Sequence, residues 1–362
     1  MPNPPSNSPI NQFLFRQRSQ WQDQPLNLLA APAGLNWQDL AADFQHSGQT
    51  LQLWTADWRA HQQATRAGIR SFFNAESAPE QLPGRTLVFW PKAKEEGYWW
   101  LKQLQTLIPE ELLLLGETHG GIKALAKQLQ QSGVDIGKMD SARRCALYSV
   151  DNLQPAIDLI NEHTLIHQWQ GPDQLSLISQ PGVFSHGRVD EGSALLLQAF
   201  AQSSDLLNKG RLLDIGCGCG LLGAWLLQHH PDLQLTACDV SGFALQATRA
   251  TLSANQLPAN PQQQAQVFAA DIFTGVESHT PAGGFDLIIS NPPFHTGKDT
   301  DYELASRLIH QAPEFLKPGG QLWIVANRFL PYPDLLEQAF GSFTSVAENG
   351  KFRVYLAIRG KQ

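Results

Sequence analysis

The chain has few of the features that would place it in a membrane or outside the cell. It contains no apolar run near the roughly 18 residues that a membrane helix needs. Only four cysteines occur in 362 residues, which excludes a disulfide framework and indicates a reducing cytoplasm as the setting. Residues 1–10 are rich in Pro, Asn and Ser and lack the basic start and apolar core of a secretory signal. We expect a short disordered tail there.

An excess of positive charge is also absent. The net charge is -7, with 26 basic against 33 acidic residues, and both halves of the chain are negative. Proteins that bind long RNA or DNA avidly usually have a basic excess, so binding by bulk charge alone is disfavoured. A local basic face stays open, because the sequence does not show which charges share a surface.

Two of the four cysteines, Cys217 and Cys219, lie in a glycine-rich loop. A metal site would need partner ligands at suitable spacing, and none are evident in the sequence. The loop needs small residues, and cysteine is small. We therefore expect structural thiols and no metal.

The second half alternates between short apolar runs and helical apolar spacing. Lys317-Pro318-Gly319-Gly320 indicates a break between elements, and Asn349-Gly350 the turn of a closing hairpin. The alternation predicts an α/β fold with a doubly wound, Rossmann-like sheet that has helices on both faces. Strands are predicted at 211–217, 233–239, 265–271, 285–291, 321–327 and 352–359, and helices at 221–229, 242–255, 302–316 and 334–340.

The first half alternates as well, with a strand and then a turn predicted within 86–92, a strand at 112–116 and helices at 98–108 and 122–131. It lacks both the glycine loop and the Asn-Pro-Pro sequence of the second half. We therefore expect a second α/β domain without a cofactor site of its own. The pattern is interrupted at Gly171-Pro172. The predicted organisation is a tail at 1–10, an N-terminal domain at 11–170, a linker at 171–185 and a catalytic domain at 186–362.

The first strand of the second half ends in Leu213-Asp214-Ile215-Gly216-Cys217-Gly218-Cys219-Gly220. Gly216, Gly218 and Gly220 let the backbone turn tightly and let a ligand approach closely. A dinucleotide site is an alternative, because Gly218-Cys219-Gly220-Leu221-Leu222-Gly223 formally matches its pattern. Asp214 stands two residues before the first glycine, where it could hold the amino group of a methionine moiety.

Two further acids follow at the ends of the next strands. Asp239 ends the second strand, where a carboxylate accepts hydrogen bonds from both ribose hydroxyls. Asp271 ends the third strand and is placed to accept from an adenine amino group, with Ile272 against the ring. Together with Asp214 and the sequence that ends the fourth strand, they favour S-adenosylmethionine over a nicotinamide dinucleotide as the cofactor.

The fourth strand ends in Asn291-Pro292-Pro293-Phe294. In isolation this is a common turn sequence. Beside a glycine loop that binds a methyl donor, the same sequence indicates methyl transfer to the nitrogen of a planar amine or amide. The Asn291 side-chain oxygen and the Pro292 carbonyl would accept hydrogen bonds from the NH2 group and aim its lone pair. Pro292 and Pro293 fix the backbone, and Phe294 offers a face on which a base can stack. We expect His295 to line the pocket rather than act as a base.

These motifs resemble the ribosomal RNA small subunit methyltransferase C family, with its large-subunit relatives as a close second. The resemblance covers the chain well from about residue 181 onward and is weaker before it. The stretches that carry it are Phe89-Trp90-Pro91-Lys92, Pro181-Gly182-Val183-Phe184-Ser185, residues 213–220, Cys238-Asp239-Val240-Ser241, residues 290–295 and residues 324–333.

The resemblance implies two tandem class I methyltransferase domains, of which the N-terminal one has lost its donor site. It implies methyl transfer from S-adenosyl-L-methionine to the exocyclic N2 of a guanine in 16S rRNA of the 30S subunit. It implies that Phe184 lies in a loop covering the site and that Asp190 opens the helix beneath. By the same resemblance the guanine would lie at residues 291–294, and the donor would be held by Asp214, Gly216, Asp239, Asp271 and Asn291.

Three alternatives remain at this point. The same chemistry could act on 23S rRNA. Methylation of a protein glutamine amide uses a similar corner, although that motif usually ends in Tyr where this chain has Phe294. A non-catalytic RNA-binding protein could also retain the donor site as a relic. We also expect a cytoplasmic monomer without membrane contact.

Overall fold

The computed structural model describes residues 8–73, 82–105, 107, 109–258, 265–292 and 298–360, with the backbone but not the side chains of 298–301. The chain divides into two compact units, Met1–Ile166 and His167–Gln362. In the described ranges each unit contains a seven-stranded sheet, and the strands follow the same order in both. The predicted α/β class and the tandem arrangement are therefore confirmed.

The first unit has the strand order β3-β2-β1-β4-β5-β7-β6. Its first five strands are parallel, and β6 and β7 form an antiparallel hairpin beside β5. Its strands are β1 (Leu26–Leu29), β2 (Leu51–Thr55), β3 (Arg70–Phe73), β4 (Arg85–Phe89), β5 (Glu111–Glu117), β6 (Ile136–Ala142) and β7 (Cys145–Val150), and its helices are α1 (Pro9–Arg16), α2 (Trp37–Ser47), α3 (Trp58–Arg66), α4 (Lys94–Leu104), α5 (Ile122–Gln131) and α6 (Ile157–His163).

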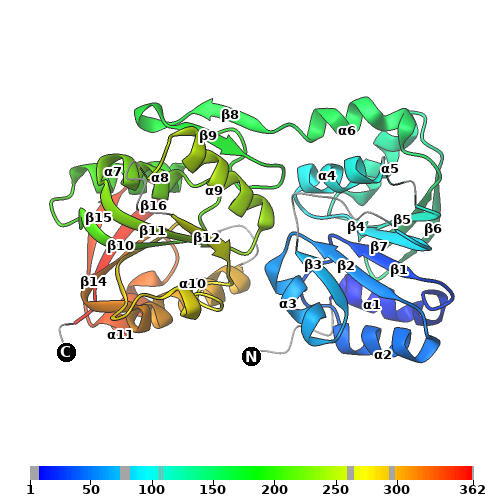
Figure 1. Ribbon diagram of the computed structural model, residues 1–362, viewed down its shortest axis with the longest axis horizontal. Coiled ribbons are helices and arrows are strands. Elements are labelled where there is room, and N and C mark those ends of the chain that lie inside the picture. The colour runs from blue at the N-terminus through cyan, green and yellow to red at the C-terminus, as the bar shows by residue number, and fades with distance from the viewer. Residues whose placement is uncertain are drawn as a thin grey trace. The chain divides into compact units, whose positions relative to one another are not determined.

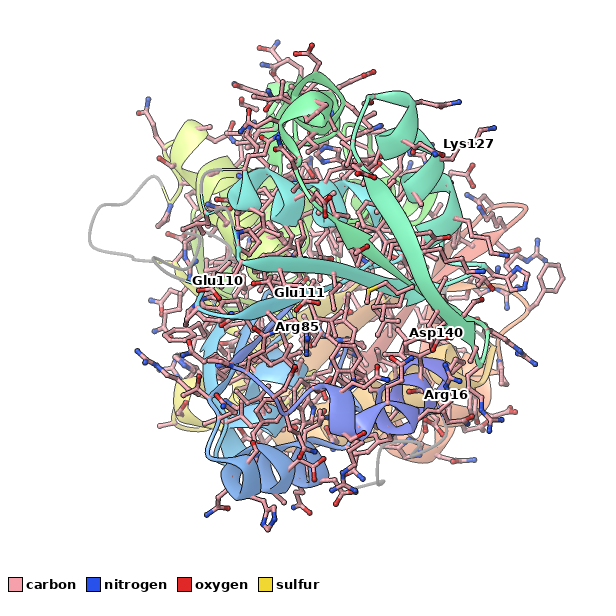
Figure 2. All side chains as sticks on the ribbon, turned by 90° about the vertical axis from the view of Figure 1, so that its right-hand side faces the viewer. Arg16, Arg85, Glu110, Glu111, Lys127 and Asp140 are labelled. Carbon is pink, nitrogen blue, oxygen red and sulfur yellow. The ribbon has the colours of Figure 1, made fainter. Side chains whose placement is uncertain are left out.

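Two apolar layers hold the first unit together. Side chains of α1, α2 and α3 pack on one face of the sheet, and those of α4, α5 and α6 on the other (Figure 1). Ion pairs at the rim add little, because exposed pairs contribute about 0–1 kcal/mol each. Arg16 pairs with Asp140 in this way, whereas the more buried Arg85 reaches Glu111 on the neighbouring strand at 2.8 Å (Figure 2).

The second unit has the order β12-β11-β10-β13-β14-β16-β15. A separate hairpin of β8 (His167–Gln170) and β9 (Ser176–Ser179) precedes it. The sheet consists of β10 (Lys209–Ile215), β11 (Asp232–Asp239), β12 (Gln266–Ala269), β13 (Phe285–Ser290), β14 (Leu316–Asn327), β15 (Phe343–Glu348) and β16 (Phe352–Ile358), with helices α7 (Glu191–Gln202), α8 (Leu221–His229), α9 (Gly242–Ala254), α10 (Lys298–Phe315) and α11 (Tyr332–Phe340).

Helices cover both faces of this sheet, as a doubly wound fold requires. Figure 1 shows α7, α8 and α9 on one face and α10 and α11 on the other. The predicted helix at 221–229 matches α8, and the predicted closing hairpin is β15 with β16. Within the described ranges, no helix combines the length and apolar character needed to cross a bilayer.

Two predicted boundaries are wrong. Lys317-Pro318-Gly319-Gly320 does not separate a helix from a strand, because β14 already begins at Leu316. The four residues form an irregularity in the β13–β14 pairing, where Phe285 pairs with Leu316 and Leu287 with Gln321. The helix predicted at 98–108 is α4, which begins at Lys94 with Glu95 and Glu96 in its first turn, where acidic side chains are favoured. Ile108 itself lies outside the described residues.

Candidate active site

The carboxyl ends of three neighbouring strands meet at one edge of the second sheet. Ile215 of β10 pairs with Cys238 of β11 on one side and with Ser290 of β13 on the other. The Ser290 hydroxyl also donates to the Ile215 carbonyl at 2.9 Å. The glycine loop, Asp239 and Asn291 therefore begin at the same level, at the place where ligands bind in open α/β sheets.

The glycine loop forms an open cradle at this edge. Gly216 and Gly218 have φ values of 74° and 57°, a left-handed conformation that residues with a Cβ rarely adopt. An added Cβ at either position would meet nothing within 4 Å. The loop is held from behind, since the Gly216 amide donates to the Cys238 carbonyl at 2.8 Å and the Gly218 amide to Asp239 Oδ2 at 3.1 Å. These glycines thus leave room for a ligand against the backbone.

Asp214 is a buried acid with an unused acceptor. Asp214 is only 1% exposed, and its Oδ2 accepts a hydrogen bond from the Gly223 amide at 3.2 Å. Its Oδ1 has no hydrogen-bond partner among the described residues. Burial raises the pKa of Asp214 to about 7, and the charge of Asp239 adds to the shift. A cationic amino group placed here would satisfy the oxygen and favour the ionised acid.

Asp239 is fixed at the end of β11. Its Oδ1 accepts from the Ser241 amide at 2.9 Å, which sets the turn into α9, and its Oδ2 accepts from Gly218. A carboxylate at the end of this strand suits two neighbouring hydroxyl groups, since both of its oxygens are acceptors.

Asp271 and Ile272 lie just after β12, which ends at Ala269, two residues earlier than predicted. The Asp271 carboxylate accepts from both terminal nitrogens of Arg307 at 3.4 Å. Ile272 is buried in the apolar core and has a φ of 58°. That conformation is strained for a β-branched side chain, and such strain concentrates at ligand sites.

Asn291 is held by the helix that precedes β10. Its Nδ2 donates to Asp190 Oδ1 at 3.1 Å and to the Ser193 hydroxyl at 2.9 Å. This fixes the orientation of the amide, because a carboxylate can only accept. Asn291 Oδ1 is buried and has no partner in the described part of the chain. A Cβ at Gly192 would lie 3.2 Å from that oxygen, so the close approach of α7 depends on glycine.

Asp190 serves two purposes in this arrangement. As the N-cap of α7, its Oδ1 accepts from the Gly192 and Ser193 amides at 2.9 and 3.1 Å. It also accepts from Asn291, which lies 101 positions away in sequence. Capping was predictable from the sequence, but the contact with Asn291 and the part played by Ser193 were not.

The remaining predicted site residues are placed unequally. Pro292 is buried at the end of β13, whereas Pro293, Phe294 and His295 lie outside the described residues. Phe184 is 53% exposed in the segment between β9 and α7.

The cysteines near the loop are packed as neutral thiols. Cys217 is buried with its Sγ 3.1 Å from the Thr248 hydroxyl. Burial raises the pKa of the Cys219 thiol to about 11. In the ranges that the structure describes, no three His, Cys, Asp or Glu side chains cluster as metal ligands.

The first unit repeats the backbone of this site without its two carboxylates and its amide. The Ala30 amide donates to the Trp54 carbonyl at 2.9 Å, as Gly216 does to Cys238 in the second unit. These two hydrogen bonds make Ala30 equivalent to Gly216 and Trp54 equivalent to Cys238. The strand pairing in each unit then gives the residue of the first unit that is equivalent to each site residue of the second. Leu28, Thr55 and Phe89 stand in the first unit where the second has Asp214, Asp239 and Asn291.

Known proteins resemble the chain over almost its whole length. The methyltransferase small domain matches residues 174–356, and the corresponding N-terminal domain matches residues 11–166. The ribosomal RNA small subunit methyltransferase C of Pseudomonas aeruginosa (strain UCBPP-PA14) is 40% identical over 97% of this chain and 99% of its own. That of Pasteurella multocida (strain Pm70) is 43% identical over 78% of this chain and 81% of its own.

One solved structure also matches both units. It is a T. thermophilus 16S rRNA N2 methyltransferase in complex with AdoMet and guanosine. The TM-score is 0.78 at 21% identity, over 98% of this chain and 92% of that one. At this identity the likeness shows the shared tandem fold.

Proposed function

The chain belongs to the ribosomal RNA small subunit methyltransferase C family, and we propose that it methylates the exocyclic N2 of a guanine in 16S rRNA. Membership makes it an S-adenosylmethionine-dependent RNA methyltransferase with tandem α/β domains. We assign catalysis to the predicted catalytic domain, 186–362, which lies within the second unit, and a supporting role to the predicted N-terminal domain, 11–170.

The observation that carries the proposal is the geometry of Asn291. Its amide nitrogen is bound by Asp190 and Ser193, which leaves Oδ1 as a buried acceptor without a described partner. Leaving such a group unsatisfied costs about 1–3 kcal/mol, which a ligand N–H would offset. An exocyclic amino group provides that N–H.

The chemistry of the target explains why two acceptors are needed. The lone pair of an aromatic amino group is delocalised into the ring, so the nitrogen is a weak nucleophile. Asn291 Oδ1 and the Pro292 carbonyl would accept its two N–H groups and favour a more tetrahedral nitrogen. Catalysis then depends on positioning and on fixed dipoles rather than on a strong base.

The donor site fits S-adenosylmethionine, which supplies the methyl group when bound. Asp214 would hold the donor amino group through its unpaired oxygen, and the backbone at Gly216 and Gly218 would lie against the donor. Asp239 would bind the ribose hydroxyls. We assign Asp271 and Ile272 to the adenine, with Arg307 orienting the Asp271 carboxylate.

The flanking residues are assigned to the substrate. Phe294 would stack on the guanine, Pro293 would fix the backbone beside it, and His295 and Phe184 would line the pocket. A guanine paired in a helix would have to leave its stack to reach the site. We further propose that the protein acts in the cytoplasm as a monomer, on the 30S subunit and without a metal.

The substrate is tested by incubating the protein with labelled S-adenosylmethionine and ribosomal subunits from cells that lack the modification. We expect label in 30S particles, recovered as N2-methylguanosine after digestion of the RNA. Label only in 50S particles would move the substrate to 23S rRNA. In a parallel incubation with a release factor, label in its glutamine and none in either subunit would replace RNA by protein as the substrate.

A further inference from the structure

An aromatic side chain, Phe329, projects from the sheet edge that carries the candidate site. Phe329, in the turn between β14 and α11, is 87% exposed. The turn is ordered around it, since the Phe329 amide donates to Asn327 Oδ1 at 3.2 Å and the Leu330 amide to the Asn327 carbonyl at 3.1 Å. Hydrogen bonds within the turn therefore hold the Phe329 ring in a solvent-exposed position.

Contacts tie this turn to the anchor of Asn291. The Arg328 amide donates to the Lys351 carbonyl at 2.9 Å, across the turn of the β15–β16 hairpin. Lys351 Nζ in turn lies 3.5 Å from Glu191 Oε2, in the first turn of α7. Glu191 directly follows Asp190, which binds Asn291. The turn, the hairpin and the reacting corner thus share the carboxyl edge of one sheet.

The turn that carries Phe329 has two cations near it, Arg328 and Lys351, of which Lys351 is paired with Glu191. Arg328 is exposed and donates to the Asn349 carbonyl at 3.2 Å, a neutral acceptor that leaves its positive charge intact. Lys351 is half exposed and also lies over the Phe352 ring at 4.9 Å. Single exposed apolar residues are ordinary, but an exposed aromatic ring beside an exposed arginine matches what unpaired RNA binds.

Resting on the proposed function, we propose that Phe329, Arg328 and Lys351 form a second RNA contact beside the reacting corner. Phe329 stacks on an unpaired base that neighbours the target guanine, and the two cations bind the adjoining phosphates. Stacking tolerates any base because every base has a π face, so this surface contributes affinity and positioning.

The test compares Phe329→Ala with Ile358→Ala, which removes an apolar side chain that is 48% exposed at the opposite end of the same sheet. We expect Phe329→Ala to lower kcat/KM on unmethylated 30S subunits roughly 5- to 150-fold, with donor affinity unchanged. Phe329→Trp should restore activity, and Ile358→Ala should match the wild type. Equal activity of Phe329→Ala and Ile358→Ala would overturn the proposal.

The phosphate contact is tested separately with Arg328→Gln. We expect it to reduce the slope of log KM against log salt by about 0.7, as the loss of one contact to single-stranded RNA does. A fall in Phe329→Ala that Phe329→Trp does not rescue, with an unchanged slope in Arg328→Gln, would indicate a protein contact and contradict the RNA assignment.

Failure of the proposed function would look different. The wild type itself would then yield no N2-methylguanosine from 30S particles. The surface would still be tested by the fluorescence anisotropy of a labelled single-stranded oligoribonucleotide. Weaker binding by Phe329→Ala than by Ile358→Ala would support the contact, and equal binding would overturn it.

Discussion

Replacing Asp214 with asparagine should stabilise the free protein at neutral pH while removing its donor site. The carboxyl group is 1% exposed, and burial raises its pKa from 3.8 to about 7. The folded state therefore retains a proton that the unfolded chain has already released. The contribution of the protonated Asp214 carboxyl group to the free energy of unfolding is fully present below about pH 3.8. It declines as pH rises and is lost above about pH 7.

The magnitude follows from 1.36 kcal/mol for each unit of pKa shift. Between pH 5 and pH 8 the wild type should lose about 2–3 kcal/mol that Asp214→Asn retains. The asparagine oxygen can still accept from the Gly223 amide, so the packing is conserved. The advantage of the variant over the wild type should therefore grow by that amount across this pH range.

Denaturant unfolding of the ligand-free proteins at pH 5 and pH 8 measures the difference directly. Titration of other groups cancels between variant and wild type, and Asp232→Asn, exposed at the opposite end of β11, serves as the control. Calorimetry should show that Asp214→Asn has lost donor binding. The prediction is wrong if Asp214→Asn and the wild type differ in free energy of unfolding by the same amount at both pH values, or if Asp214→Asn binds the donor as tightly as the wild type.

Three further predictions concern the same edge of the sheet. Asn291→Ala should reduce turnover by about 10²–10³-fold while circular dichroism and donor affinity stay unchanged, because only the substrate loses its acceptor. Asp190→Ala should lower the free energy of unfolding by about 1 kcal/mol through the lost cap and also reduce kcat, whereas an unchanged kcat would separate Asp190 from the site. Gly218→Ala should weaken donor binding in calorimetry and destabilise the fold by about 1–2 kcal/mol, since its φ of 57° disfavours a Cβ even in open space.

The second sheet was largely predictable because its apolar runs in the sequence coincide with the strands that the fold buries. The apolar runs before Gly216 and Asn291 are buried parallel strands, and the helix at 221–229 has the predicted bounds. The Pro/Gly stretch at 317–320 was misread because its residues favour a break, whereas pairing on both sides of it continues the strand.

The first sheet was less accessible. Strand β1 has only four residues, all buried, so it shows no alternation that would distinguish it from a loop. The replacement of Asp214 by Leu28 becomes visible only through the strand register. Sequence showed that the first half lacks the motif, and the structure shows which residues stand in its place.

The anchor of Asn291 had no sequence signal at all. Asp190 and Ser193 are 101 and 98 positions away, and their spacing indicates only the start of a helix. Contacts between distant positions depend on how α7 packs across the sheet. The same limit applied to Phe329 and Arg328, whose place beside the Asn291 corner depends on the β15–β16 hairpin.

The central claim is that the Asn291 corner directs a methyl group to the N2 of guanine. The most direct measurement is mass-spectrometric identification of the nucleosides in 16S rRNA after wild-type and Asn291→Ala proteins act on unmethylated 30S subunits. We expect N2-methylguanosine with the wild type and about 10²–10³-fold slower formation of it with Asn291→Ala, although both bind the donor. Equal amounts from the two proteins, or a methyl group on another atom, would contradict it.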